Sequence, residues 1–388
     1  MSLNHSIKQT ILTLLKYCEK NNWAGFDPFD GLNSQIFETL PLLKNRISRL
    51  IFIQAMKRSP VNLRHIFLVP KAQNPKGLAL FCSTLIKLHN LNLMENDRQI
   101  INLLNRLIEM RSRDTDYHCW GYNFDWQNRQ FFLPKYSPNI ICTTFAGNAL
   151  LDAYKKFNDD KYLDMAVSSG NFILNGLNIY RNKDELCFSY TPFDTGQVHN
   201  ANLLGAAFLS RLHSITHEEK YLESAKSAVR FSARRQREDG SWVYGEDKKQ
   251  QWVDNFHTGY NLIALKRFSE YTKTTEYNKN IQEGFRFYKE NLFTKDGLPK
   301  YFNNQLYPID IHAIAYSIIT LAEFKSLDDN NLDLANHIFD WTMANMWDKR
   351  GYFYYQKKKF FKIRIPYMRW SQAWMLYALS ILQENYEV

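Results

Sequence analysis

Apolar and polar positions follow a pattern that repeats along the chain. Five segments begin with aromatic residues beside glycine, serine or proline and run on into a stretch rich in Ala, Gly, Leu and Ile. These apolar stretches begin near residues 141, 198, 253, 309 and 366, an interval of about 56 residues, and a fixed interval is typical of stacked supersecondary units. Each stretch predicts a helix that is buried on nearly all sides.

A second set of segments lies between the apolar stretches and combines helical periodicity with one polar face, as expected of helices exposed to solvent. The five segments span about 96–112, 160–177, 218–236, 276–291 and 329–346. A less regular pair, about 36–57 and 77–91, completes six. Helices in six hairpins, with one helix of each pair inside and the other outside, predict an all-α fold, the (α/α)6 toroid. We expect 1–388 to form one toroid domain, with 1–30 as an N-terminal helical extension.

The connections between the predicted helices differ in length. An inner helix passes to the next outer helix within a few residues, whereas the return from outer to inner is several times longer. Long connections in a compact domain are usually functional. All of them lie at the N-terminal ends of the inner helices, where free backbone N–H groups and the helix dipole also point. The sequence therefore predicts a cavity at this end of the ring.

Aromatic rings, carboxylates, amides and basic groups gather near these helix starts. Sugars bind well to such a mixture, because their C–H faces stack on aromatic rings while their hydroxyl groups form hydrogen bonds. The candidates for substrate binding are Asp125, Trp126, Asn200, Asn202, Tyr244, Trp252, Lys300, Tyr301, Tyr307, Arg369 and Trp370. Trp120, Trp126 and Trp252, in long loops, are better stacking candidates than Trp370, which shares a helix face with Trp374.

Two repeats carry the same pair of residue types at their helix starts. Asp254 is followed by His257, and Asp310 by His312. An Asp at a helix start is by default an N-cap, and a single His is more often a core residue than a catalytic one. Because the pairing occurs twice, all four residues are candidate catalytic groups. In a hydrolase the two aspartates would be acid and base; in an epimerase or lyase the two histidines would exchange a proton at carbon.

The charge and composition of the chain indicate which classes of partner it binds. The 388-residue chain has a formal net charge of +10, with a dense basic run at 357–364 that we interpret as a solvated face. Nothing resembles a nucleic-acid-binding motif, and no apolar run reaches the roughly 20 residues that a membrane span needs. Arg369 and Lys300 are candidates to hold the carboxylate or phosphate of an acidic or nucleotide-linked sugar, which the basic balance favours.

The cysteines and the remaining motifs indicate the compartment and the cofactors. Five cysteines are scattered without CxxC spacing, and the first residues lack the features of a signal peptide, so we expect a cytoplasmic protein. HExxH, Cys-His pairing and a clustered Asp triad are missing, so we expect neither a metal nor another cofactor. The acidic cluster of a terpene cyclase is missing as well.

Three segments carry a resemblance to known proteins: Trp252–Gly259, Lys300–Tyr301 with Tyr307–His312, and Tyr367–Trp374. They resemble bacterial proteins encoded in polysaccharide-biosynthesis loci, part of the six-hairpin glycosidase-like group, and the resemblance covers roughly residues 110–385. The architecture is more distantly similar to N-acylglucosamine 2-epimerases and unsaturated glucuronyl hydrolases. The resemblance implies a carbohydrate-active enzyme of polysaccharide biosynthesis that acts on a glycan or sugar intermediate.

Two other classes of function stay open at this point. A non-catalytic glycan-binding or scaffolding protein would keep the aromatic residues but would bind without Asp254 and Asp310. A toroid enzyme of the prenyl or terpenoid type, the less favoured alternative, would need a metal and a more apolar cavity. The sequence leaves the sugar, its linkage and the oligomeric state undetermined.

Overall fold

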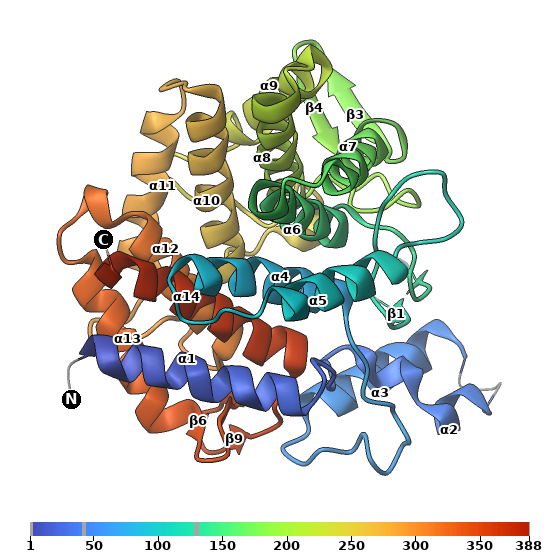
Figure 1. Cartoon of the computed structure of the whole chain (residues 1–388), viewed down its shortest axis with the longest axis vertical. Coiled ribbons are helices and arrows are strands. Elements are labelled where there is room, and N and C mark those ends of the chain that lie inside the picture. The colour runs from blue at the N-terminus through green and yellow to red at the C-terminus, as the bar shows by residue number, and fades with distance from the viewer. Residues whose placement is uncertain (1–2, 41–43, 128–131, 388) are drawn as a thin grey trace.

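An inner ring of helices organises the protein, whose computed structural model describes residues 3–40, 44–127 and 132–387. In chain order the inner helices are α4 (Pro75–Asn90), α6 (Ile140–Phe157), α8 (His199–Thr216), α10 (Asn255–Thr272), α12 (Ile311–Glu323) and α14 (Trp374–Glu387). Each one packs against the next, and α14 packs against α4, so that the ring closes (Figure 1).

An outer layer of helices covers the ring. Its members are α5 (Asp97–Glu109), α7 (Asp160–Asn175), α9 (Glu219–Ala233), α11 (Asn278–Asn291), α13 (Asn331–Met346) and α1 (Leu3–Lys20). The first five pack against the inner helix that precedes them in the chain, and α1 packs against α14. The predicted all-α (α/α)6 toroid is therefore confirmed.

The sixth outer helix is not the predicted one. The prediction that 36–57 pairs with 77–91 is wrong, because α1 takes the outer position and buries a stripe made of Ile7, Ile11, Leu14 and Cys18. Residues 36–57 instead contain α2 (Gln35–Glu38) and α3 (Arg46–Arg58), which lie to one side with η1 (Asp30–Asn33) (Figure 1). Their apolar residues do not form one buried face, since Ile47 and Ile51 are exposed.

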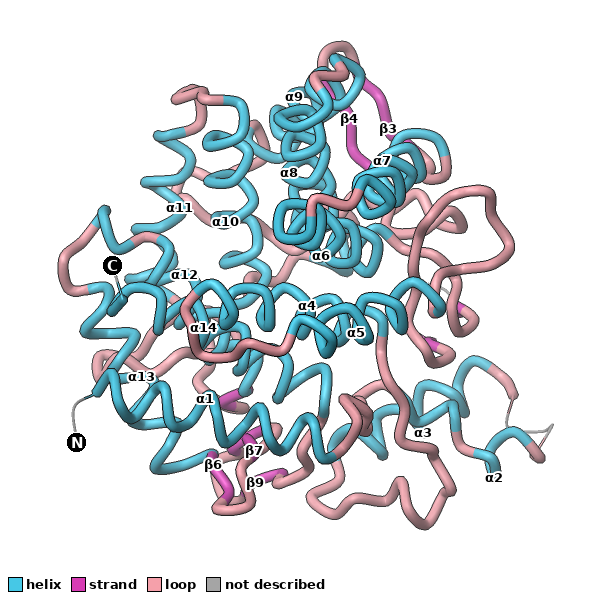
Figure 2. The backbone as a smooth tube through the Cα atoms, viewed as in Figure 1, coloured by secondary structure: helices cyan, strands magenta, loops and turns pink. Residues whose placement is uncertain are grey.

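The long loops 110–139, 176–198, 234–254, 292–310 and 347–367 run from outer to inner helices, as predicted. They carry short antiparallel strands that the sequence pattern did not predict (Figure 2). These pair as β1 (Trp126–Gln127) with β2 (Phe132–Leu133), β3 (Ile179–Asn182) with β4 (Glu185–Phe188), β6 (Trp347–Asp348) with β7 (Tyr352–Phe353), and β8 (Gln356–Lys357) with both β5 (Ile309–Asp310) and β9 (Lys362–Ile363). The basic run 357–364 thus forms the end of the β8–β9 hairpin.

Asparagine and aspartate side chains fix where several inner helices begin. Asn74, Asn139, Asp254 and Asp310 each accept a hydrogen bond from a backbone N–H of the first turn of α4, α6, α10 and α12. The start of α14 differs, because a π-helical turn, η5 (Met368–Ala373), precedes it. A π-helical turn is wider than an α-helical turn and is frequent at functional sites.

All five cysteines are buried free thiols. No helix in the described ranges combines the length and the apolar character that a membrane span requires. Short 3-10 turns, η3 (Lys248–Gln250) and η4 (Lys325–Leu327), complete the regular elements.

Candidate functional site

A cavity of about 580 Å³ lies at the N-terminal ends of the inner helices, where the long loops meet. Most of its lining residues are Phe, Tyr or Trp, and a few polar side chains reach between the rings. Of the predicted binding residues, those that line it are Trp126, Asn200, Tyr244, Trp252, Tyr301, Arg369 and Trp370. His257 and His312, predicted from different repeats, both line it as well. The fold therefore brings the two histidines to one site.

A second cavity, of about 720 Å³, lies at the opposite end of the ring. Several of its charged groups form ion pairs across helices: Arg211 contacts Asp152 at 2.6 Å, and Lys87 contacts Glu384 at 2.6 Å. Paired groups of this kind hold helices together and leave little for a ligand to bind. The cavity at the helix N-termini contains polar atoms without partners and is the better candidate.

The imidazole of His257 forms a hydrogen bond with the carboxylate of Asp254 at the start of α10. Its Nδ1 lies 2.6 Å from Oδ2 of Asp254, and because a carboxylate only accepts, Nδ1 carries the hydrogen. Asp254 also accepts from the His257 backbone N–H at 2.9 Å and from Trp252 Nε1 at 3.0 Å. Nε2 of His257 has no hydrogen-bond partner in the described part of the chain and is the ring's basic nitrogen. An imidazole held in this way can act as a general base toward a ligand in the cavity.

His312 is buried between two aromatic rings at the start of α12. Its ring stacks on Phe256 at 4.6 Å and on Trp374 at 4.7 Å. Nε2 lies 3.1 Å from the Tyr260 hydroxyl, while Nδ1 is buried without a partner among the described residues. Burial, together with the nearby cations Lys76 and Arg369, holds the pKa of His312 well below its usual value. The imidazole is therefore neutral near pH 7.

Asp310 is buried and its oxygens are occupied. It accepts hydrogen bonds from the His312 backbone N–H at 2.8 Å, from Trp370 Nε1 at 2.9 Å and from Gln356 Nε2 at 2.5 Å. Burial raises the pKa of this carboxyl group. Asp310 does not line the cavity. The geometry makes it a helix cap that also holds Trp370 in place.

Lys76, which the sequence reasoning missed, lies at the inner end of the cavity. The side chain is 4% exposed, and its Nζ lies 3.2 Å from the Tyr260 hydroxyl. Burial, with a smaller effect of Arg369, lowers the pKa of Lys76 to about 7. A signal was present in the sequence, because Asn74 and Pro75 mark a helix start. The predicted helix began at 77, beyond the lysine.

Arg369 lines the cavity but is already paired. Its Nε and Nη2 donate to the two carboxylate oxygens of Asp27 at 2.6 and 2.8 Å, a bidentate ion pair. Asp27 precedes α4 by more than 40 residues, and nothing in the sequence pattern linked it to Arg369. The positive charge of Arg369 is therefore balanced by the protein itself.

Four predicted binding residues lie outside the cavity lining. Lys300 donates from Nζ to the Asn291 carbonyl at 3.0 Å, and Asp125 accepts from the Lys135 backbone N–H at 2.8 Å. Tyr307 is partly buried against the core. Asn202 belongs to a separate network of hydrogen bonds.

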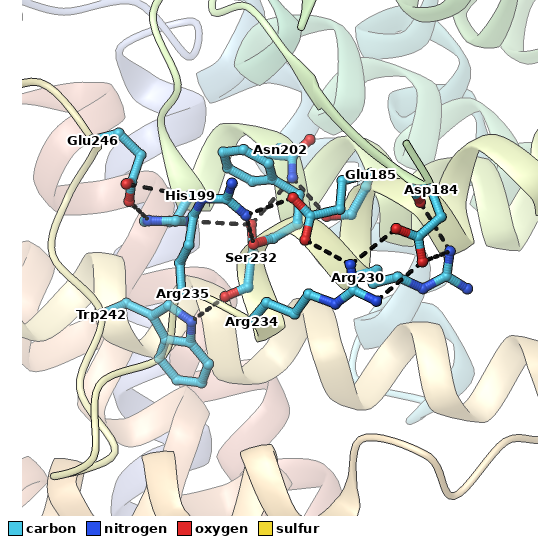
Figure 3. Close-up of polar contacts among 12 residues, drawn as sticks. Asp184, Glu185, His199, Asn202, Arg230, Ser232, Arg234, Arg235, Trp242 and Glu246 are labelled. Atoms are coloured by element: carbon cyan, nitrogen blue, oxygen red, sulfur yellow. Dashed lines mark hydrogen bonds and ion pairs between the residues drawn. The ribbon is translucent and has the colours of Figure 1, made fainter. Parts of the chain in front are cut away.

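The Asn202 network connects α8, α9 and the loops behind the cavity (Figure 3). Asn202 accepts from the Phe188 N–H at 3.1 Å and donates to the Ala228 carbonyl at 2.7 Å. His199 lies in the same network, 2.8 Å from Glu246 and 3.2 Å from Ser232 (Figure 3). The hydrogen bonds of Asn202 are used within the protein, so its role here is structural. Asn200, in contrast, lines the cavity with a buried Oδ1 that has no partner among the described residues.

Metal ligands do not gather at this site: over residues 3–40, 44–127 and 132–387, no three His, Cys, Asp or Glu side chains are placed to hold an ion. The polar groups that reach the cavity are instead imidazole, amine, guanidinium and amide groups. These groups suit proton transfer and hydrogen bonding to hydroxyl or carbonyl oxygen.

Comparison with known proteins supports the fold. No protein-family model matches the sequence, and no curated protein matches it. Among solved structures, a cellobiose 2-epimerase from Bacillus thermoamylovorans has a TM-score of 0.63 at 13% identity, over 81% of this chain and 88% of that one. An unsaturated glucuronyl hydrolase specific for heparin has a TM-score of 0.63 at 12% identity, over 100% and 98% of the two chains.

A GH76 α-mannanase from Bacteroides thetaiotaomicron is also similar, with a TM-score of 0.62 at 12% identity, over 81% of this chain and 87% of the mannanase. All three have the toroid of the six-hairpin glycosidase group, as the sequence resemblance implied. At such low identity the likeness shows the fold and leaves the activity to be argued from the site.

Proposed function

We propose that this chain is a carbohydrate-active enzyme of polysaccharide biosynthesis that exchanges a proton at a carbon atom of a sugar, as an epimerase or lyase does. The observation that carries the proposal is the meeting of His257 and His312 in one aromatic cavity. The ring centre of Tyr260 lies 6.1 Å from that of each imidazole, so both histidines are neighbours of the same phenol ring.

The two histidines suit complementary roles. His257, whose Nδ1 donates to Asp254, has its Nε2 left for a ligand and acts as the base that removes a proton from carbon. His312, neutral and in contact with the Tyr260 hydroxyl, exchanges the second proton through that hydroxyl. Positioned general acid–base groups contribute about 10² to 10⁴ in rate. Similar toroids that include a cellobiose 2-epimerase support this chemistry.

Hydrolysis by an aspartate pair has less support. A glycosidase needs one carboxyl group to donate a proton and another to act as base or nucleophile at the scissile bond. Here Asp310 does not line the cavity, and Asp254 lies beneath His257 and Trp252 with its oxygens engaged. We therefore assign both aspartates to positioning, Asp254 toward His257 and Asp310 toward Trp370.

A glycan-binding role is the second candidate, and one feature favours it. Tyr244 and Trp252 stack at 4.6 Å with an angle of 12° between their planes, and both line the cavity. Such a platform binds the C–H face of a sugar whether or not chemistry follows. Lys76, Arg369 and the two histidines make the cavity too polar to favour a prenyl chain.

The test is solvent-deuterium exchange. The purified protein is incubated in D2O with neutral sugars, uronates and nucleotide sugars, and deuterium on carbon is followed by NMR. We expect exchange with one sugar class, and a loss of about 10²-fold or more in His257→Gln and His312→Gln. Asp254→Asn keeps a residue that can cap the helix, so the fold should persist. Its NH2 group would face the N–H groups of Trp252 and His257 and could not accept their hydrogen bonds, so deuterium exchange should fall.

A matched control and a binding measurement decide between the candidates. His5→Gln, on the exposed side of α1, should exchange at the wild-type rate. If a sugar raises the melting temperature of the wild-type protein but no deuterium enters, the protein is a glycan-binding module. Unchanged exchange in both cavity histidine variants would refute the catalytic assignment.

A further inference from the structure

The charge of Lys76 has no counter-ion in the described part of the chain. Within residues 3–40, 44–127 and 132–387, no Asp or Glu oxygen lies within 4.0 Å of its Nζ, and the one hydrogen-bond partner of the amine is the Tyr260 hydroxyl. Buried lysines are almost always paired, because burial without a partner disfavours the charged form. Yet Lys76 lines the cavity, so its amine is within reach of a ligand.

Aromatic rings surround the amine of Lys76. Its Nζ lies 4.5 Å from the ring centre of Phe145, 5.1 Å from that of Trp374 and 5.3 Å from that of Tyr260. Arg369 adds a second cation, and together with burial this lowers the pKa of Lys76 to about 7. Desolvation in an apolar pocket and a neighbouring cation are the two features that activate lysine as a nucleophile.

We propose that Lys76 forms an imine with the carbonyl group of an open-chain sugar. The inference rests on the proposed function and deepens it, since it names the substrate class as sugars with a free aldehyde or ketone. An imine also explains why the amine lies beside two proton-transfer groups. A protonated imine withdraws electrons from the adjacent carbon, whose proton then becomes acidic enough for an imidazole to remove.

The steps balance without an added oxidant or reductant. The Nζ lone pair forms the C–N bond, the carbonyl π electrons move to oxygen, and a proton passes from nitrogen to that oxygen. The hydroxyl group of the carbinolamine then accepts a proton from Tyr260 and leaves as water, which gives the protonated C=N group. One imidazole removes the adjacent proton, which leaves an enamine, and the other returns a proton to the opposite face. Water adds to the C=N carbon and releases the sugar and the free amine.

Tyr260 is placed to carry the protons of imine formation. Its hydroxyl lies 3.2 Å from Lys76 Nζ and 3.1 Å from His312 Nε2, so it can give a proton to the leaving oxygen and regain one from either side. Asn200, His257 and Arg369 also line the cavity and are candidates to hydrogen-bond the sugar. The inner end of the cavity thus supplies a nucleophile, a proton carrier and substrate contacts.

The experiment is reductive trapping. The full chain is incubated at pH 7 with glucose, mannose, N-acetylglucosamine or glucuronate and sodium cyanoborohydride, then digested and mapped by mass spectrometry. We expect the Lys76 peptide to gain the mass of the sugar less one oxygen atom, ahead of Lys279, whose side chain is 83% exposed. Lys249→Arg, which removes the other lysine that lines the cavity, should retain the Lys76 adduct.

The outcomes separate this inference from the proposed function. Deuterium exchange without a Lys76 adduct, with Lys279 labelled, refutes the imine and leaves the proton-transfer function standing. If no sugar exchanges or reacts, glycolaldehyde serves as the smallest hydroxy-carbonyl probe: faster labelling of Lys76 than of Lys279 supports the nucleophile, and slower labelling refutes it. Lys76→Arg keeps the charge but cannot form an imine, so deuterium exchange that survives in this folded variant would assign Lys76 to anion binding instead.

Discussion

His312 and Lys76 are both basic side chains, yet burial holds both toward their neutral forms. Among the residues that the structure describes, Nδ1 of His312 has no hydrogen-bond partner and Lys76 has only the Tyr260 hydroxyl. Buried polar groups with too few partners reduce the stability of the fold, and proteins retain such groups mainly where function needs them. At the residue scale, a variant with an apolar side chain in place of one of these buried basic groups should therefore be more stable than the wild-type protein.

Replacing Lys76 by methionine tests this idea. The pKa of Lys76 is about 7 in the fold against 10.5 for the free side chain, so between these values the unfolded chain binds more protons. Wild-type stability should thus rise with pH relative to Lys76→Met, by about 1.4 kcal/mol per pH unit from pH 7 to 10.5. The variant is expected to be the more stable protein at pH 7.

Urea denaturation of both proteins at several pH values measures the difference. A parallel pH dependence of the two unfolding free energies would show that Lys76 stays charged in the fold. The same variant should lack deuterium exchange, which separates stability from activity.

At the scale of elements, the site depends on how closely α10 and α12 approach. Gly259 lies at the contact, and a Cβ there would meet Tyr316 Cδ1 at 2.5 Å and Thr320 Oγ1 at 2.9 Å. His257 and His312 lie near the starts of these two helices. A change in their spacing therefore moves one imidazole relative to the other.

Gly259→Ala should destabilise the protein by about 1–3 kcal/mol, because an added methyl group overpacks a buried helix contact. Deuterium exchange should fall as well, since the two histidines separate. Denaturation and exchange are measured on the same preparation. Gly196→Ala is the control: the nearest atom to its Cβ would be Asp194 Oδ1 at 3.2 Å, outside the helix contact. Equal stability loss in both variants would contradict the packing argument.

At the scale of the whole molecule, the first and last helices close the ring. α1 packs against α14, and η5, which carries Arg369 and Trp370, leads directly into α14. Arg369 in turn binds Asp27, near the start of the chain. The cavity therefore depends on contacts between residues more than 300 positions apart.

Ile11→Ala tests this closure. Ile11 is fully buried in α1, so the truncation should reduce the free energy of unfolding by about 2–5 kcal/mol. Lys16→Ala changes an exposed residue of the same helix and should have little effect. Both are measured by thermal and urea denaturation. A loss of less than about 0.5 kcal/mol in Ile11→Ala would show that α1 is a dispensable extension.

The sequence by itself determined the repeating part of the fold. An interval of about 56 residues fixed the inner and outer helices from residue 96 onward, because amphipathic periodicity is a local property. It also placed Asp254, His257, Asp310 and His312 at equivalent helix starts. It failed for the sixth pair, since α1 and α14 lie at opposite ends of the chain and no local pattern records their contact.

Only the tertiary structure decided what each candidate does. The Asp–His pairs look alike in sequence, yet His257 bonds to its carboxylate through Nδ1 whereas His312 stacks between rings and bonds to Tyr260. Lys76 and Asp27 belong to no repeat motif and reach the site only because the ring closes. The physical reason is that protonation and hydrogen bonding depend on neighbours in space, and burial assigns those neighbours after the helices have packed.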